Sequence, residues 1–381
     1  MSLTRGRQLE LGLLLALCLF LPLYEAPKSL AWLAYVGVWL ANRVVARDFG
    51  GRWDFWDSLI AAWIGSAFLA AAFAGLRGSE WHGALDVLRY GSVLWTLRRS
   101  RFSQREIEWV LGMLVASVVA GLALGYARMA AGTAARLELN SVGHVNHTAI
   151  YLAMALGLCV SWLFIGSLGA GAAALVILVS LFVTQSRAGL GAGLLTMLVL
   201  GVAWWRRSRR PLALAVAVLL ATALVGMFGA TGIFEKQMAQ LEAGDVLNYR
   251  DRVWHIAITT WERHPWFGVG MDNFALVTRG EEEPYRSLFP HAHNLFLNTL
   301  AERGAVGAAA LAAVLLALLV ALVRRRPSAS DGDDEWLPWG AAAGAWIVTC
   351  VAGLVNTTLH HEHGLLACLL FGCWLARLPR R

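Results

Sequence analysis

Two arginines and a pair of histidines stand beside long apolar runs, where ionisable side chains are costly. Arg187 interrupts an apolar stretch, Arg250 lies at the start of a segment with helical periodicity, and His291 and His293 follow that segment. Charged groups at or inside a bilayer are functional candidates by default. A guanidinium matches the oxygen geometry of phosphates, and a neutral imidazole is a base at physiological pH. These residue types predict a site that binds a phosphate group and accepts a proton.

Each arginine also has a structural interpretation. The guanidinium of Arg187 can extend from an apolar helix to a membrane–water interface, although its small neighbours leave room for a ligand. Arg250 and the nearby Arg252 can form a solvated helix end with Asp251 between them. They can equally form an anion site together with the free N–H groups of that helix start. The sequence leaves these alternatives open.

The histidines raise the question of a metal. His291 and His293 are two residues apart, and three more histidines occur within 360–363. No Cys or carboxylate set at ligand spacing accompanies them, so no metal site is predicted. The five cysteines all lie in apolar runs, which argues against a disulfide framework and a zinc pattern. The chain has no Walker-type phosphate loop, so an ATP-driven motor is not expected.

Two further polar clusters interrupt the apolar pattern. His82, Asp86 and Arg89 recur at spacings of four and three, which places them on one face of a helix. The second cluster surrounds the start of another predicted helix and contains Asn140, His144, Asn146 and His147. Each cluster either lines a cavity or forms a polar stripe that neighbouring helices satisfy.

The composition limits the class of protein. The 381 residues are 58% hydrophobic and 15% charged, with a mean hydropathy of +0.58. A soluble domain has nearer a quarter of its residues charged, so an ordinary soluble enzyme and a disordered chain are both excluded. The formal net charge is +7, but the charges form short clusters between apolar runs, so no nucleic-acid partner is expected.

The apolar runs predict an all-α, polytopic membrane protein with about twelve spans, each near the ~20 residues that a bilayer requires. The first run follows Arg5 and Arg7 like a signal peptide, but no convincing cleavage site follows, so it is predicted to be a helix. The predicted spans are 9–24, 29–46, 58–76, 82–97, 107–126, 147–165, 168–184, 188–205, 211–230, 304–323, 337–356 and 363–377.

Arginine clusters alternate between the loops and predict the orientation, with both chain ends on the cytoplasmic side. The chain then divides into nine spans over 1–230, one long outer loop over 231–303, and three spans over 304–381. Within the loop, 249–263 and 293–302 are predicted to be short helices. The apolar face of 249–263 is expected to lie on the membrane surface.

Three local motifs occur in order on the predicted outer side, and through them the chain resembles the O-antigen ligase family of bacterial inner membranes. That family is close to O-antigen polymerases and some protein O-oligosaccharyltransferases. The motifs are Ser186-Arg187-Ala188-Gly189, then Arg250 and Trp254 followed by Pro265 and Gly268-Val269-Gly270, and His293-Asn294 followed after 295–303 by Gly304 and Gly307.

The resemblance implies an activity at the periplasmic face. A polysaccharide, the O-antigen, would pass from undecaprenyl pyrophosphate to a sugar hydroxyl of lipid A–core, with inversion at the anomeric carbon and without metal or other cofactor. By position in the motifs, His293 would be the base, and Arg187 and Arg250 would hold the pyrophosphate. Expected partners are both lipid-linked substrates and membrane lipids. Additional candidate residues are Arg252, His291, Asn294 and His147.

The residue chemistry fits this expectation without the resemblance. Guanidinium groups stabilise the charge that grows on a pyrophosphate leaving group, and a neutral histidine can accept the proton of a sugar hydroxyl. An O-antigen polymerase or a protein O-oligosaccharyltransferase would use the same chemistry with another acceptor. A lipid-linked sugar transporter would need polar groups in both halves of the bilayer, whereas the unusual charges gather at the outer side.

Overall fold

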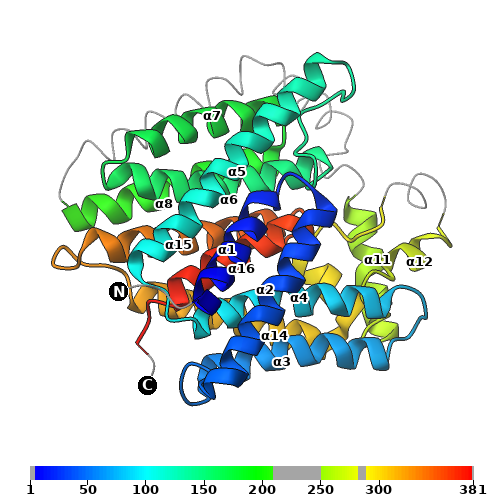
Figure 1. Cartoon of the computed structure of the whole chain (residues 1–381). Helices are drawn as coiled ribbons and strands as arrows, with labels where there is room; N and C mark the ends of the chain where they lie inside the picture. Colours follow the sequence, from blue (N-terminus) through cyan, green and yellow to red (C-terminus); the bar gives the residue numbers. More distant parts are fainter. Residues whose placement is uncertain (1–4, 209–249, 282–288, 380–381) are drawn as a thin grey trace.

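The chain folds into helices joined by turns and loops, with no strand in the residues described. The structure is a computed structural model that describes residues 5–208, 250–281 and 289–379 (Figure 1). The first part contains α1 (Arg5–Phe20), α2 (Glu25–Ala46), α3 (Phe55–Ala72), α4 (Glu80–Arg99), α5 (Gln104–Ala130), α6 (Val145–Phe164), α7 (Leu168–Thr184) and α8 (Arg187–Ser208). The second part contains α11 (Arg250–Arg263), α12 (Phe274–Thr278), α14 (Leu295–Arg324), α15 (Asp333–Gly353) and α16 (His361–Leu375).

The apolar helices are those of a polytopic membrane protein. Seven described helices are long and apolar enough to cross a membrane, namely α2, α3, α5, α6, α8, α14 and α15, and α7 is a shorter apolar helix. Eleven of the twelve predicted spans coincide with described helices, and the remaining one, 211–230, lies outside the described residues. The first predicted span is the helix α1.

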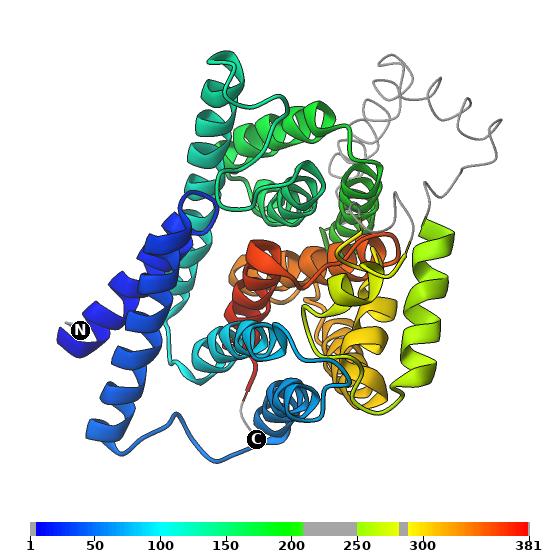
Figure 2. The same cartoon turned by 90° about the vertical axis from the view of Figure 1, so that its right-hand side faces the viewer.

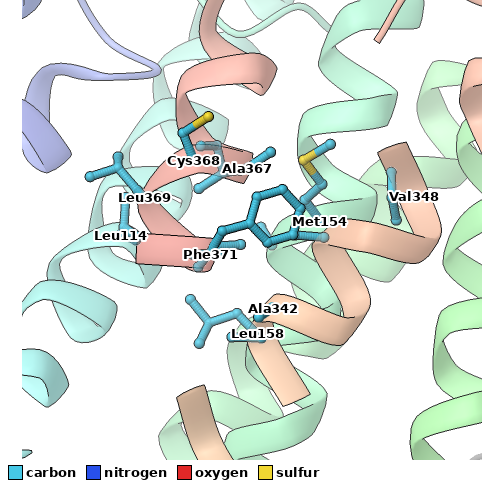
Figure 3. Packing of buried hydrophobic residues seen from close by; sticks show 14 of the residues in the cluster. Leu114, Met154, Leu158, Ala342, Val348, Ala367, Cys368, Leu369 and Phe371 are labelled. Carbon is cyan, nitrogen blue, oxygen red and sulfur yellow. The ribbon is translucent and has the colours of Figure 1, made fainter. Parts of the chain in front are cut away.

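The centre of the molecule is formed by α6, α15 and α16, which contact one another. Figure 2 shows α15 and α16, in orange and red, enclosed by the other helices. Phe371 of α16 is buried among side chains of α6 and α15 that include Met154 and Ala342 (Figure 3). Small residues let α6 and α15 approach closely, since a Cβ on Gly157 would lie 3.1 Å from the Cα of Gly344.

Helix α14 is broken at Gly304, where φ is 61° and ψ is −166°. A Cβ there would lie 2.3 Å from the carbonyl carbon of Trp266, so only glycine fits. The segment 265–270 runs past the break and replaces the helix's own hydrogen bonds. The bonds are Val269 N to Ala301 O at 2.9 Å, Gly270 N to Glu302 O at 2.9 Å, Ala305 N to Pro265 O at 2.8 Å and Val306 N to Trp266 O at 3.2 Å.

Two further glycines of these motifs, Gly268 and Gly307, have structural explanations as well. A Cβ on Gly268, where φ is 68°, would lie 2.4 Å from the carbonyl carbon of Glu302, so the 265–270 segment approaches α14 backbone to backbone. A Cβ on Gly307 would lie 2.2 Å from the Cβ of Arg303, whose guanidinium donates to Trp63 O. The expected short helix over 293–302 is thus the first part of α14, and the motif glycines shape its break.

The predicted helix over 249–263 is confirmed as α11, but its surroundings differ from the expectation. Its apolar face does not lie on a membrane surface. Val253, Ile256 and Ala257 are buried in a second apolar cluster with Phe274 and Ala301, and α11 packs against α14 (Figure 2). An amphipathic helix has the same apolar periodicity whether its apolar face packs on protein or on lipid, so the sequence alone could not distinguish the two.

At the end of the bundle where α3 begins, buried charges are paired. Asp57 and Arg99 are 0% and 3% exposed, and Arg99 Nε donates to Asp57 Oδ1 at 2.8 Å. The same guanidinium donates to the carbonyl oxygens of Phe49, Gly51 and Arg52. Arg99 therefore ties the loop before α3 to the end of α4.

Candidate active site

Three separate helix starts supply the residues predicted to do chemistry. Arg187 is the first residue of α8, Arg250 is the first residue of α11, and His293 precedes Asn294, the N-cap of α14. Arg187 is exposed and Arg250 is half-buried. A helix start also offers free backbone N–H groups, so these positions suit an anionic ligand.

Electrostatic interactions link the three groups in order, Arg187 with Arg250 and Arg250 with His293. Burial, followed by the positive charge of Arg250, lowers the pKa of His293 to about 4, and a hydrogen bond with Asn356 acts in the opposite direction. Burial and the charge of Arg187 lower the pKa of Arg250. His293 is therefore a neutral base throughout the physiological range, and it interacts with the guanidinium group of Arg250.

His293 is held rigidly by the start of α14. Its backbone is left-handed, with φ at 47°, and its ring makes an edge contact with Phe289 at a centroid distance of 5.5 Å. Asn294 accepts from Phe296 N at 2.9 Å and Leu297 N at 3.0 Å, and it donates to Leu354 O at 2.9 Å. Asn294 thus caps α14 and positions the histidine before it.

Small residues place Arg187 against the centre of the bundle. A Cβ on Gly189 would lie 2.6 Å from the Cβ of Ala149, so the first turn of α8 packs directly on α6. The buried Ser186 hydroxyl has no hydrogen-bond partner among the described residues. Nor does the described part of the chain contain an acidic partner for Arg187. The guanidinium is accordingly available to a ligand.

Arg252 has a different setting from Arg250. Its guanidinium forms an exposed ion pair with Glu281 at 3.2 Å. The pKa of His293 responds to Arg250, and Arg252 is not among its causes. Of the two neighbouring arginines, Arg250 faces the histidine.

A cluster of histidine rings lies beside His293. The centroid of His291 is 4.7 Å from that of His360, and His147 lies 5.7 Å from His361 and 5.2 Å from His363. Burial, followed by the charge of His360, lowers the pKa of His291 to about 3. Within 5–208, 250–281 and 289–379, no three His, Cys, Asp or Glu side chains are arranged to hold a metal ion.

Two residues near the site were missed by the sequence reasoning. Asn356, in the turn after α15, hydrogen-bonds His293, and Asp272 lies 3.7 Å from His360 Nε2. Asp272 is two residues after Gly270, the end of the glycine motif, and this closeness to a motif is the one sequence signal for it. Asn356 has no such signal.

Unusual backbone conformations gather around the same place. Left-handed φ values at residues other than glycine are costly and cluster at functional sites. Six such residues occur in the described chain, and all but Arg47 belong to the loops and helix ends that carry this site or adjoin it. The five are Gln185 (54°), Asp272 (59°), His293 (47°), Leu359 (54°) and His361 (45°).

A groove of about 830 Å³ adjoins the arginine side of the site. Its polar lining includes His144, Asn146 and Gln185, close in sequence to His147 and Arg187. Its apolar lining comes from α7 and includes Val179 and Val183, both of which are exposed. A groove that is polar at one part and apolar at another suits an amphiphilic ligand.

One comparison with known proteins found a family match. Residues 172–312 match the family model described as O-antigen ligase, and the match includes Arg187, Arg250 and His293. A search of curated proteins gave no match. Members of the matched family are glycosyltransferase-like membrane enzymes. Residues 172–312 of the chain are therefore similar to the O-antigen ligase family.

Proposed function

We propose that this protein is an O-antigen ligase of the bacterial inner membrane. It transfers polysaccharide from undecaprenyl pyrophosphate to a sugar hydroxyl of lipid A–core, without a metal. The proposal has twelve spans, both chain ends in the cytoplasm and the site at the periplasmic face. The observation that carries it is a neutral histidine that interacts with Arg250, which in turn interacts with Arg187, and these charges suit the reaction.

In this reaction the two arginines bind the pyrophosphate of the donor. Arg187 and Arg250 hold the phosphate oxygens at the starts of α8 and α11, where backbone N–H groups add to the positive potential. The charge on those oxygens grows as the bond to the anomeric carbon breaks. Removing one such donor costs roughly 2.7–4 kcal/mol of transition-state stabilisation in comparable sites.

His293 accepts the proton of the acceptor hydroxyl. The hydroxyl oxygen forms a bond to the anomeric carbon as the carbon–oxygen bond to the pyrophosphate breaks, and the configuration at that carbon inverts. Donor binding also strengthens the base. The phosphates offset the charge of Arg250, which otherwise lowers the pKa of His293, so basicity rises when the donor is in place.

The groove beside Arg187 supports a lipid-linked donor. Its polar lining includes Gln185, two residues before Arg187, and its apolar lining includes the exposed Val179 and Val183 of α7. A pyrophosphate held at Arg187 would therefore have an apolar surface for the first isoprenyl units. The aqueous groove of a soluble glycosyltransferase would not need the exposed valines of α7.

The test is complementation of a chromosomal deletion, followed by gel analysis of lipopolysaccharide. Deletion should remove the long-chain ladder while lipid-linked polymer accumulates. A product with one repeat unit on the core would instead indicate a polymerase, and an unaltered ladder together with loss of a glycoprotein would indicate a protein O-oligosaccharyltransferase.

Two histidine variants assign the base. His293→Ala should fail to restore the ladder although the protein reaches the membrane, because general-base catalysis contributes about 10²–10⁴-fold. His255→Ala is the matched control, since His255 is exposed on α11 and its ring has no hydrogen-bond partner in the described structure. A normal ladder with His293→Ala would shift the role to His291 or refute a histidine base.

A further inference from the structure

The groups around the candidate base are ordered by charge from one side to the other. The charge of Arg187 lowers the pKa of Arg250, and the charge of Arg250 lowers the pKa of His293, so the two arginines make one side of the site cationic. On the other side His291 contacts His360, with ring centroids 4.7 Å apart, and His360 Nε2 lies 3.7 Å from Asp272 Oδ1. The site therefore has a cationic side and an acidic side, with the base between them.

A second carboxylate belongs to the acidic side. Gly83 of α4 lies directly against the loop that carries Asp272, since a Cβ on Gly83 would be 3.1 Å from Asp272 Oδ2. Asp86 is three residues further along the same helix and interacts electrostatically with Asp272 and His360. The spacing of polar residues predicted a polar stripe on this helix that includes Asp86. In the structure Asp86 lies near Asp272 and His360.

These groups retain unused hydrogen-bonding capacity. In the described structure Asp86 Oδ1 lies 3.7 Å from Arg89 Nη1, and Asp272 Oδ1 lies 3.7 Å from His360 Nε2. Both distances are longer than a hydrogen bond. The Nδ1 atoms of His291, His360 and the fully buried His363 also have no partner among the described residues.

The neighbouring ion network does not supply the missing partners. Lys28 is buried and pairs with Glu362 and Glu25, and Ser141 donates to the same two carboxylates. Arg89 is shared between Asp86 and Glu25, 3.9 Å away, and its guanidinium lies over the ring of Trp32. Lys28 is thus paired with Glu362 and Glu25, and Arg89 lies no closer than 3.7 Å to either of its carboxylates, so Asp86 and Asp272 have room for donors.

We propose that Asp86, Asp272 and His360 form an acceptor subsite that binds hydroxyl groups of the acceptor saccharide. Carboxylates accept two or more hydroxyl hydrogen bonds each, and hydroxyl donors relieve the repulsion between two nearby carboxylates. The same negative charge repels phosphate, so the pyrophosphate of the donor is confined to the arginine side. The subsite thus selects a neutral sugar ring and presents one of its hydroxyls toward His293.

The inference rests on the proposed function, because it assigns the second substrate of the same reaction. It is tested with Asp272→Asn and Asp86→Asn, assayed as purified full-length protein in detergent with both lipid-linked substrates. Asparagine adopts left-handed φ readily, so Asp272→Asn keeps the turn at φ 59°. Glu262→Gln is the control, as an exposed carboxylate of α11 without a partner in the described structure.

Each aspartate variant should raise the KM for the acceptor about tenfold, the loss expected when a charged hydrogen bond is weakened. The KM for the donor should stay within about twofold, and Glu262→Gln should leave both constants unchanged. An acceptor KM that does not move, or a donor KM that rises by as much, would overturn the proposal.

Direct binding separates this inference from the proposed function. The probe is a dephosphorylated core oligosaccharide titrated into the protein without donor and followed by saturation-transfer NMR. Binding to the wild-type protein that is weakened by Asp272→Asn supports the subsite even if no transfer is detected. Equal binding by the wild-type protein and both variants refutes the subsite and leaves the proposed transfer activity standing. A phosphorylated core fragment should bind the wild-type protein more weakly than the dephosphorylated one.

Discussion

The effect of Arg250 on His293 gives a prediction with a definite size. Burial and the Arg250 charge together lower the pKa of His293 from 6.5 to about 4. Arg250→Gln removes the charge and leaves the burial, so the pKa should rise by about 1, toward 5. A base works in its neutral form, so activity is lost as the pH falls through this pKa. At pH 5 the neutral fraction should drop from about 90% to about 50%.

The assay is the pH dependence of kcat/KM for transfer, which reports the pKa of the free enzyme. Arg250→Gln should also lower the rate at neutral pH. Each pH profile is therefore divided by its own maximum before the acid limbs, the falls in kcat/KM at low pH, are compared. Arg250→Lys keeps the charge and should retain the wild-type limb despite a lower rate. Arg252→Gln should change neither, because Arg252 pairs with Glu281. An acid limb that is identical in all four proteins would refute the electrostatic coupling.

Three further outcomes are expected. Gly304→Ala should lower the midpoint of thermal unfolding in detergent, because the left-handed backbone costs about 1–3 kcal/mol and the new Cβ would overlap Trp266. The control Gly65→Ala should leave the midpoint unchanged, because a Cβ on Gly65 has nothing within 4 Å. Equal midpoints for the two variants would contradict the break in α14. Asp57→Asn should destabilise the protein by about 3–5 kcal/mol by leaving Arg99 buried without its counter-charge, and a melt like that of the wild type would argue against this pair. Treatment with EDTA should leave transfer intact, and loss that is reversed by added metal would refute a metal-free mechanism.

The sequence predicted the helices well because each is determined by local composition. A run of about twenty apolar residues has few alternatives to a helix, so eleven predicted spans coincide with described helices. What surrounds a helix is not local. The apolar face of α11 was expected to lie on a membrane surface, and the structure packs it against α14.

The candidate site was predicted in part. Residue type and position pointed to Arg187, to the Arg250–Arg252 pair and to the His291–His293 pair, and the resemblance selected Arg250 and His293. In the structure Arg187 interacts with Arg250, and Arg250 interacts with His293. Asp272 and Asn356 were missed because their positions depend on turns between distant helices. Neither residue recurs at a helical spacing, and Asp272 lies against Gly83, which is far away in the sequence.

The hydrogen bonds between the 265–270 segment and the break in α14 restrict how the site can open. They join the loop that follows α11 to the helix that follows His293, and α11 also packs on α14, so a change in the distance from Arg250 to His293 would break these contacts. Arg187 lies at the start of α8, which packs on α6. Entry of the donor and departure of the spent carrier are therefore expected to change the separation of the two arginines, while the distance from Arg250 to the base stays constant through the cycle.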